Sequence, residues 1–224
     1  MNLQHNLFEL EQRILAVCDR AGRKRDKITL IAVSKTQSVE IILQAYDLGI
    51  RDFGENRVQE LLRKKDLLPQ DIRWHLIGHL QSNKAKYIAG FIHYVHSIDS
   101  LETAKELSKR AMQHSRKINI LLEVNVAAEE SKEGIASSEI SELSSLIFAE
   151  AASLNINGLM TVAPYEEHVE QVRPYFKELH KLCGEFGWQE LSMGMSNDFE
   201  VAIEEGATMI RIGSLLFGER TKNF

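Results

Sequence analysis

The feature that most constrains the fold is an alternation of short apolar runs with longer amphipathic stretches along the 224 residues. The short runs are rich in β-branched residues, which is typical of strands buried on both faces of a parallel sheet. The predicted strands are Ile28–Ser34, Asp52–Gly54, Trp74–Ile77, Tyr94–Ser97, Ile118–Asn125, Ile156–Thr161, Glu190–Met195 and Met209–Ile212. The stretches between them have helical periodicity, as in Val39–Leu48, Leu101–Gln113, Ser137–Leu154 and Glu166–Phe186.

Eight such strands alternating with helices predict an α/β fold, a (β/α)₈ TIM barrel. An open doubly wound sheet is the alternative, but no Gly-x-Gly-x-x-Gly fingerprint follows the first strand. No Pro-rich or Gly/Ser-rich linker divides the chain, so we expect residues 1–224 to form a single domain. A further helix, Leu3–Ala21, precedes the first strand and is expected to pack on the outer wall or bottom of the barrel.

Local signals mark several helix ends. Ser38, Ser100 and Ser138 stand where N-capping residues are expected, with a glutamate at or near the third helical position. Gly49 and Gly206 follow helical stretches and tolerate the left-handed backbone that commonly ends a helix. These positions predict where the helices begin and end.

The charge balance argues against two classes of partner. A net charge of −5 and a pI of about 5.9 give no support for nucleic-acid or membrane-surface binding. The one basic cluster, Arg23–Lys27, is short and interrupted, which is typical of a solvated turn. Cys18 and Cys183 lie in apolar helical patterns and are expected to be buried free thiols. With no signal peptide or membrane span in the sequence, we expect a cytoplasmic protein.

In a barrel of this type, reactive groups gather at the C-terminal ends of the strands. Lys35 directly follows the apolar run Leu30–Val33, and desolvation there is expected to lower the pKa of its ammonium group. A neutral amine is what Schiff-base formation requires. The alternative is a lysine whose charged end extends from the strand into solvent.

Two adjacent segments predict a site for an anionic group. Ser196 lies in a small-residue turn between a strand and the helical segment Glu200–Glu205, where backbone N–H groups and a hydroxyl favour a phosphate. Gly213 and Ser214 follow the neighbouring strand, and barrels often bind phosphate after strands seven and eight. A simple N-cap is the alternative role for Ser196. Together these segments suggest a phosphorylated ligand opposite a reactive lysine.

The histidines predict no metal site. His75 lies within a strand and is expected to be a core imidazole satisfied by hydrogen bonds. His79 follows Gly78 at a strand end, and its side chain could equally face the pocket or point away from it. No His-x-x-x-His or His-Glu-x-x-His pattern occurs, so we expect no metal.

From about Ile14 to Arg220 the sequence resembles the pyridoxal phosphate homeostasis protein family, small barrels related to the N-terminal domain of alanine racemase. The blocks that carry the resemblance are Ala32–Thr36, Phe53–Glu60, Trp74–Lys84, His96–Ser100, Gly158–Thr161, Ser192–Ser196, Arg211–Ser214 and Phe217–Arg220. Leu76 departs from the aromatic or methionine residue that is usual in the family, a change we expect to affect packing and not chemistry.

The resemblance implies that Lys35 holds pyridoxal 5′-phosphate (PLP) as a Schiff base. It further implies that Ser196, Gly213 and Ser214 bind the phosphate and that Arg211 faces the pyridine nitrogen. Asn56, His79 and Met195 would line the cofactor pocket. The expected function is to carry or buffer PLP in intracellular vitamin B6 homeostasis.

The expected role is that of a carrier and not of an enzyme. Enzymes that use PLP as a strong electron sink pair the pyridine nitrogen with a carboxylate, and an arginine cannot take that role. The related racemase obtains a second base, a tyrosine, from a C-terminal domain, for which we expect no counterpart here. A racemase-like enzyme using Lys35 alone or with Tyr165 is one alternative, and a PLP-free lysine aldolase acting on a sugar phosphate is another.

The remaining expectations concern partners. We expect a monomer, because the second domain that contributes the racemase dimer interface is not expected here. PLP-dependent apo-enzymes are the expected recipients of the cofactor. The loop 127–134 follows the fifth strand and would either cover the pocket mouth or be a solvated loop.

Overall fold

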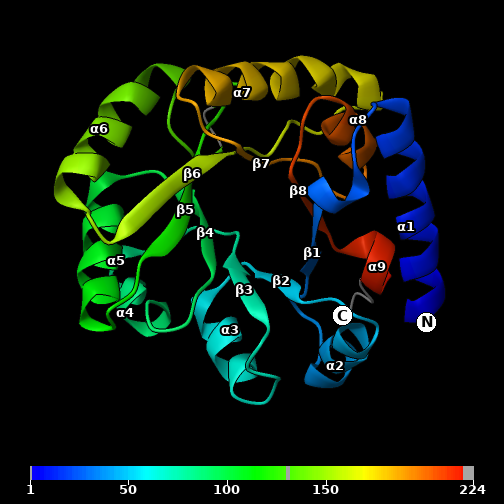
Figure 1. Ribbon diagram of the computed structural model, residues 1–224, viewed down its shortest axis with the longest axis horizontal. Coiled ribbons are helices and arrows are strands. Elements are labelled where there is room, and N and C mark those ends of the chain that lie inside the picture. The colour runs from blue at the N-terminus through cyan, green and yellow to red at the C-terminus, as the bar shows by residue number, and fades with distance from the viewer. Residues whose placement is uncertain (1, 130–131, 219–224) are drawn as a thin grey trace.

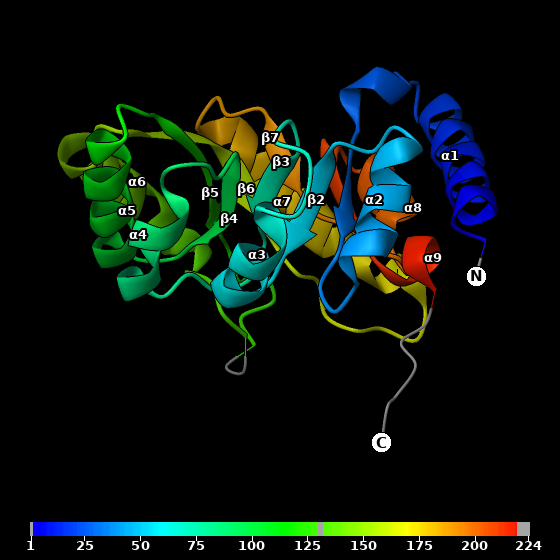
Figure 2. The same ribbon diagram turned by 90° about the horizontal axis from the view of Figure 1, so that it is seen from below.

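The computed structural model describes residues 2–129 and 132–218. Within these residues, eight parallel strands form a closed barrel in chain order, with the last strand paired to the first (Figures 1 and 2). The strands are β1 (Thr29–Val33), β2 (Asp52–Glu55), β3 (Arg73–Leu76), β4 (Tyr94–Ile98), β5 (Ile118–Glu123), β6 (Leu154–Met160), β7 (Glu190–Ser192) and β8 (Met209–Ile212). The predicted (β/α)₈ barrel is therefore confirmed, and the open doubly wound sheet is wrong.

Helices surround the strands as an outer ring (Figure 1). They are α1 (Leu3–Arg20), α2 (Val39–Asp47), α3 (Val58–Lys65), α4 (Ala85–Ile88), α5 (Leu101–Gln113), α6 (Ile140–Glu150), α7 (Arg173–Glu185), α8 (Phe199–Glu204) and α9 (Ser214–Phe217). Short 3₁₀ helices are η1 (Arg25–Lys27), η2 (Ser82–Lys84), η3 (Ser137–Glu139) and η4 (Val169–Val172). Helix α1 packs beside α8 and α9 on the outer wall, as the sequence predicted.

Two of the three predicted serine caps are confirmed. The Ser38 hydroxyl accepts a hydrogen bond from the Ile41 N–H, and Ser100 caps α5 in the same way. The Ser138 cap is wrong, because Ser138 lies inside η3 and a side-chain oxygen of Glu139 instead accepts the Ala136 N–H at 2.7 Å.

Two predicted helices are too long. The first was expected to run to Leu154, but α6 ends at Glu150 and Leu154 already pairs with Ile118 of the barrel. The second was expected to start at Glu166, but α7 starts at Arg173. Pro174 explains this start, since proline fits the first turn of a helix but would break its interior.

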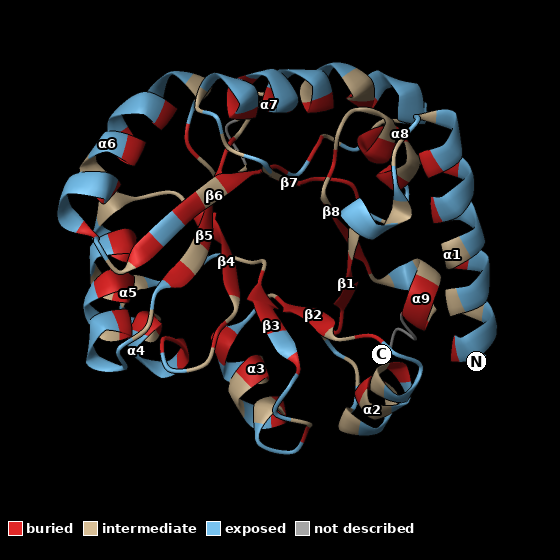
Figure 3. Ribbon diagram, viewed as in Figure 1, coloured by how far each residue is buried: buried red, intermediate tan, exposed pale blue. Residues whose placement is uncertain are grey.

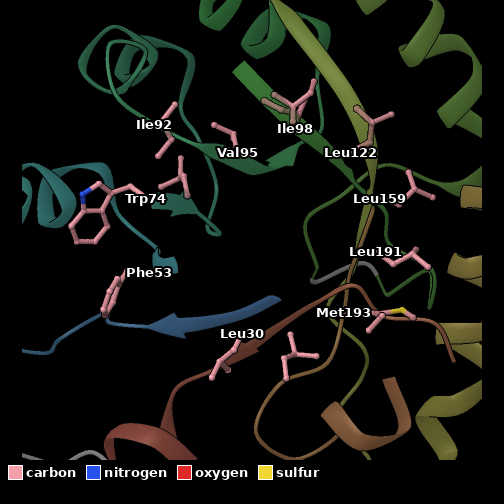
Figure 4. Close-up of a cluster of buried hydrophobic side chains, with 14 of the residues drawn as sticks. Leu30, Phe53, Trp74, Ile92, Val95, Ile98, Leu122, Leu159, Leu191 and Met193 are labelled. Atoms are coloured by element: carbon pink, nitrogen blue, oxygen red, sulfur yellow. The ribbon is translucent and has the colours of Figure 1, made fainter. Parts of the chain in front are cut away.

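The core has two apolar layers. One lies between the barrel wall and the helices and includes Leu30, Phe53, Trp74, Leu122 and Leu159 (Figures 3 and 4). The other is a smaller cluster made of Ile31, Tyr94, Leu121, Met160 and Met209. Its members come from β1, β4, β5, β6 and β8, and they alternate along these strands with residues of the first layer, so they fill the barrel interior.

The structure also places the two cysteines. Cys18 and Cys183 are both buried free thiols, as expected. Across the described part of the chain, no helix has the length and apolar character needed to cross a membrane. Glu219 and Arg220, the end of the last resemblance block, and residues 130 and 131 of the 127–134 loop lie outside the described residues.

Candidate functional site

A cavity of about 380 Å³ opens at the C-terminal ends of β1, β2 and β8. It brings together seven of the eight site residues predicted from the sequence: Lys35, Asn56, Met195, Ser196, Arg211, Gly213 and Ser214. Val33, Thr36, Gln37, Ile77, Val162 and Gly218 complete the lining. A volume of this size suits a small organic ligand.

The backbone just before Lys35 is anchored by a buried ion pair. The Lys64 ammonium donates to the Ser34 carbonyl oxygen at 2.8 Å and to Glu55 Oε1 at 2.8 Å. The Ser34 hydroxyl donates to the same carboxylate oxygen at 2.7 Å. Glu55 and Lys64 are both buried, so these contacts are shielded from water. Lys35 itself is half-buried and lines the cavity from the end of β1.

The backbone just after Lys35 is held in an unusual conformation. Thr36 has φ of 67°, a left-handed value that is rare for a residue with a branched side chain. Its N–H donates to Glu60 Oε1 at 2.6 Å, and the same oxygen accepts from Lys64 at 2.6 Å. Strained residues of this kind persist only where neighbouring contacts hold them, and they cluster at functional sites. The lysine is therefore fixed on both sides by one charged network.

Another part of the cavity wall offers groups that suit an anion. Gly213 immediately precedes α9, and Ser214 is the first residue of that short helix. The first N–H groups of a helix have no acceptor within the helix. The Ser196 hydroxyl lies next to them and accepts the Leu215 N–H at 3.4 Å. Backbone N–H groups beside hydroxyls are typical of a phosphate site.

The turn that carries Ser196 depends on a glycine and an aspartate. Gly194 has φ of 91°, and a Cβ at this position would collide with Ala202. The Met195 N–H donates to Asp198 Oδ1 at 2.6 Å, and burial raises the pKa of this carboxyl group. Met195 is partly exposed at the cavity edge, with 38% of its surface accessible.

Arg211 places a buried guanidinium on the cavity wall. Its Nη1 donates to the Ser192 hydroxyl at 2.7 Å, and its Nη2 donates to the Thr161 carbonyl oxygen at 2.8 Å. Burial lowers the pKa of Arg211 to about 10, against the opposing effects of Asp198 and Glu123. The group therefore remains a cation at neutral pH. Two acceptors hold it, and its other N–H groups remain as donors.

Asn56 contributes an oxygen that needs a hydrogen-bond donor. Its Oδ1 atom is buried and has no hydrogen-bond partner among the described residues, although Asn56 lines the cavity. Buried polar atoms in native proteins nearly always have a partner. A ligand with a suitably placed donor would satisfy this atom, so the cavity has the polar character of a binding site.

The structure places His79 and Tyr165 elsewhere. His79 is exposed, has its Nδ1 atom 3.4 Å from Asp99 Oδ2, and lines a neighbouring hollow that includes Asn56 and Glu133. Tyr165 has 85% of its surface accessible and lines another hollow. Neither residue lines the Lys35 cavity. His75 is buried with both ring nitrogens hydrogen-bonded, as predicted.

Sequence reasoning missed the network that supports Lys35. Glu55 lies in the sequence block Phe53–Glu60, which by itself indicates no role for the glutamate. No sequence pattern marks Lys64 or Thr36 as a site residue. The available signal was the i, i+4 spacing of Glu60 and Lys64, which places them on one face of α3. That spacing alone predicts an ordinary exposed ion pair, and nothing local shows that Lys64 points into the protein.

Comparison with known proteins agrees with this arrangement. Residues 5–221 match the family described as "Alanine racemase, N-terminal domain". The chain is 45% identical to the pyridoxal phosphate homeostasis protein of Aquifex aeolicus, covering 98% of this chain and 99% of that one. It is 38% identical to the protein of the same name from Escherichia coli K12, covering 98% and 97%.

Solved structures give the same relationship. PipY of Synechococcus elongatus, described with PLP bound, is 33% identical, with a TM-score of 0.80 over 93% of this chain and 99% of that one. Alanine racemase of Clostridium difficile has a TM-score of 0.74 at 16% identity, covering 99% of this chain but 58% of the racemase, a likeness of fold. The chain therefore belongs to the pyridoxal phosphate homeostasis protein family, within the larger group defined by the N-terminal domain of alanine racemase.

Proposed function

We propose that this chain binds pyridoxal 5′-phosphate covalently through Lys35 and carries or buffers it in intracellular vitamin B6 homeostasis. The observation that carries the proposal is one cavity lined by Lys35 at the end of β1 and by Ser196, Gly213 and Ser214 after β7 and β8. Its relatives named as PLP homeostasis proteins, and a related structure described with PLP bound, support the choice of cofactor.

The residues fit the chemical groups of PLP. The Lys35 amine would bind the cofactor through the aldehyde that PLP supplies, as a Schiff base formed with loss of one water. Ser196, Gly213 and Ser214 would hold the dianionic phosphate through a hydroxyl and backbone N–H groups. Arg211 would donate to the pyridine nitrogen.

Two further residues would shape the pocket. The buried Asn56 Oδ1, which has no partner among the described residues, would accept a hydrogen bond from the ligand. The Met195 side chain would line the cofactor pocket at the cavity edge. We also propose that the whole chain acts as one PLP-binding barrel domain.

The chemistry of Arg211 supports the carrier role. A cationic guanidinium donates hydrogen bonds and cannot take up a proton, so Arg211 would leave the ring nitrogen of PLP unprotonated, and carbanion stabilisation would be weaker. Tyr165, the candidate for a second base, lies in another hollow. Relatives that are 45% and 38% identical to this chain are named for PLP homeostasis, which supports the non-enzymatic role. The recipients we propose are PLP-dependent apo-enzymes.

The experiment is an absorbance titration of the purified protein with PLP, followed by borohydride reduction and peptide mass mapping. We expect a reducible absorption band and a phosphopyridoxyl adduct on Lys35, with neither in Lys35→Ala. Lys84→Ala is the matched control, because Lys84 lies in η2 and does not line the cavity. An adduct on another lysine would overturn the assignment to Lys35. No band and no adduct would overturn PLP binding and favour a PLP-free aldolase.

A second assay separates the carrier from the racemase-like alternative. The loaded protein is incubated with L-alanine and other L-amino acids, and the D-enantiomers are measured by chiral chromatography. We expect no turnover above free PLP, together with transfer of the cofactor to an apo-enzyme. Sustained racemisation that disappears in Lys35→Ala would show an enzyme instead.

A further inference from the structure

A line of hydrogen-bonded side chains crosses the interior of the barrel and ends at Arg211. Asp52 Oδ1 lies 3.0 Å from His75 Nε2, and His75 Nδ1 lies 2.9 Å from His96 Nε2. His96 Nδ1 lies 2.9 Å from the Ser192 hydroxyl, which accepts from Arg211 Nη1 at 2.7 Å. All five residues are buried. They come from β2, β3, β4, β7 and β8, so the line joins opposite walls of the barrel.

The Asp52 end of the line has a fixed polarity. Asp52 is the first residue of β2 and is also held by Arg73, which donates to both of its carboxylate oxygens. Burial opposes ionisation of Asp52, but the hydrogen bonds from Arg73 and His75 lower its pKa to about 2. The carboxylate is therefore an acceptor at neutral pH, and His75 Nε2 must carry a hydrogen.

The other groups then have one arrangement that satisfies them all. Burial lowers the pKa of His96 well below its ordinary value, so this ring is neutral and has a single N–H. If that hydrogen is on Nε2, it is donated to His75 Nδ1, and His96 Nδ1 accepts from the Ser192 hydroxyl. The Ser192 oxygen in turn accepts from Arg211. Every hydrogen bond then points from the arginine towards Asp52.

The opposite arrangement leaves a group unsatisfied. A doubly protonated His75 would donate to His96 Nε2, and His96 would then donate from Nδ1 to Ser192. The Ser192 oxygen would accept two hydrogen bonds, and its own hydrogen would have no acceptor among the described residues. A second buried cation in line with Arg211 would also be costly. Buried polar networks are stable when every member is satisfied.

We propose that His75, His96 and Ser192 are positioning residues, which transmit the anchoring of Asp52 to Arg211 and hold its guanidinium in place on the cavity wall. The inference rests on the proposed function, in which Arg211 would donate to the pyridine nitrogen of PLP. The line holds the guanidinium through Nη1, and N–H groups that make no bond to the line can face the ligand. A substitution at Ser192 would therefore alter the affinity for the cofactor and the environment of its ring nitrogen while leaving Arg211 itself in the sequence.

The first test needs no cofactor. Imidazole ¹⁵N–¹H NMR of the purified protein at pH 7 reports the tautomers of His75 and His96. We expect both rings to be neutral and to carry hydrogen on Nε2. Hydrogen on Nδ1 of His96, or a doubly protonated His75, would overturn the direction of the line. This result is independent of whether PLP binds.

The second test uses Ser192→Ala, which removes the link next to Arg211. We expect the dissociation constant for PLP to rise by roughly tenfold, the effect of one hydrogen bond to a charged group. With PLP labelled at the ring nitrogen, we expect the ¹⁵N shift of the bound cofactor to change as well. Ser144→Ala is the matched control, because this buried serine of α6 bonds its own helix at the Ser141 carbonyl, away from the cavity.

The outcomes separate the two proposals. Unchanged affinity and ring-nitrogen shift in Ser192→Ala, with the Lys35 adduct intact, would overturn the positioning role and leave PLP binding standing. If the unmodified protein forms no adduct with PLP, the proposed function fails and the positioning role fails with it, whereas the NMR result still decides the direction of the line. A purely structural role for Ser192 would lower stability but leave the ring-nitrogen shift unchanged.

Discussion

Lys64 is the residue whose replacement tests the support of Lys35 most directly. Its ammonium donates three hydrogen bonds, to the Ser34 carbonyl oxygen and to carboxylate oxygens of Glu55 and Glu60, at 2.6 to 2.8 Å. Lys64→Met keeps most of the side-chain volume and removes the charge. Among the described residues, the buried Glu55 carboxylate would then keep only the Ser34 hydroxyl as a side-chain partner.

The expected loss of stability is large. Removing one partner of a buried ion pair typically costs about 3–5 kcal/mol, because the remaining charge is left without compensation. With a urea m-value of about 3 kcal/mol/M, the unfolding midpoint should fall by about 1–2 M. Lys105→Met is the control, since the Lys105–Glu150 pair is exposed and its loss should cost less than about 1 kcal/mol.

The loss should also depend on pH. Burial raises the pKa of Glu55 above its ordinary value despite the hydrogen bonds from Lys64 and Ser34, so removing Lys64 raises it further. An acid with a raised pKa in the folded state destabilises the protein once it ionises, so the deficit should be larger at pH 8 than at pH 5.

A double variant completes the test. Lys64→Met combined with Glu55→Gln removes both charges and should recover a large part of the lost stability. The reasoning would be refuted if Lys64→Met behaved like Lys105→Met, or if the double variant were no more stable than Lys64→Met.

Three other predictions follow from single contacts. Gly158→Ala should destabilise the barrel by at least about 1–3 kcal/mol, because the new Cβ would collide with a backbone carbonyl of β7. Gly184→Ala in α7 is the control, because its new Cβ would lie in open space and should stabilise the helix slightly. Urea unfolding compares the stability of the two variants. Because the pKa of Asp52 is lowered to about 2, its carboxylate should contribute about 2 kcal/mol to the free energy of unfolding above pH 4, and this contribution should be lost as the pH falls towards 2. If Asp52→Asn lost stability in acid as steeply as the unmodified protein does, the prediction would be contradicted. Burial raises the pKa of Cys183 to about 11, so at pH 8 a thiol reagent should label it far more slowly in the folded than in the urea-unfolded protein.

Much of the fold could be predicted from local patterns. Each predicted strand overlaps an observed one. The signal is strongest where a strand buried on both faces reads as a continuous apolar run, as in β1 (Thr29–Val33). The glycines expected at helix ends, Gly49 and Gly206, have φ of 100° and 106°. The errors lie at boundaries, as at Ser138 and Leu154, where pairing with a neighbouring strand or a local capping bond decided between two acceptable conformations.

The candidate site was predictable to a similar extent. Strand order in a closed barrel places Lys35 beside Arg211 and Gly213, since β1 pairs with β8, and the sequence motifs already marked these residues. His79 carries an equally recognisable motif, yet it lies in a neighbouring hollow. A residue in the loop after a strand can point to either side of the rim, and its spacing does not decide which.

The sequence by itself determined the barrel and marked Lys35, Ser196 and Gly213 as candidate site residues, because these depend on periodicity and on short segments. Only the tertiary structure decided that Lys64 turns inward to anchor Ser34, and that Asp52, His75, His96 and Ser192 form a line to Arg211. The partners in that line lie 19 to 96 residues apart in the chain. No local pattern pairs residues so distant, and they meet because closing the barrel directs their side chains into one interior.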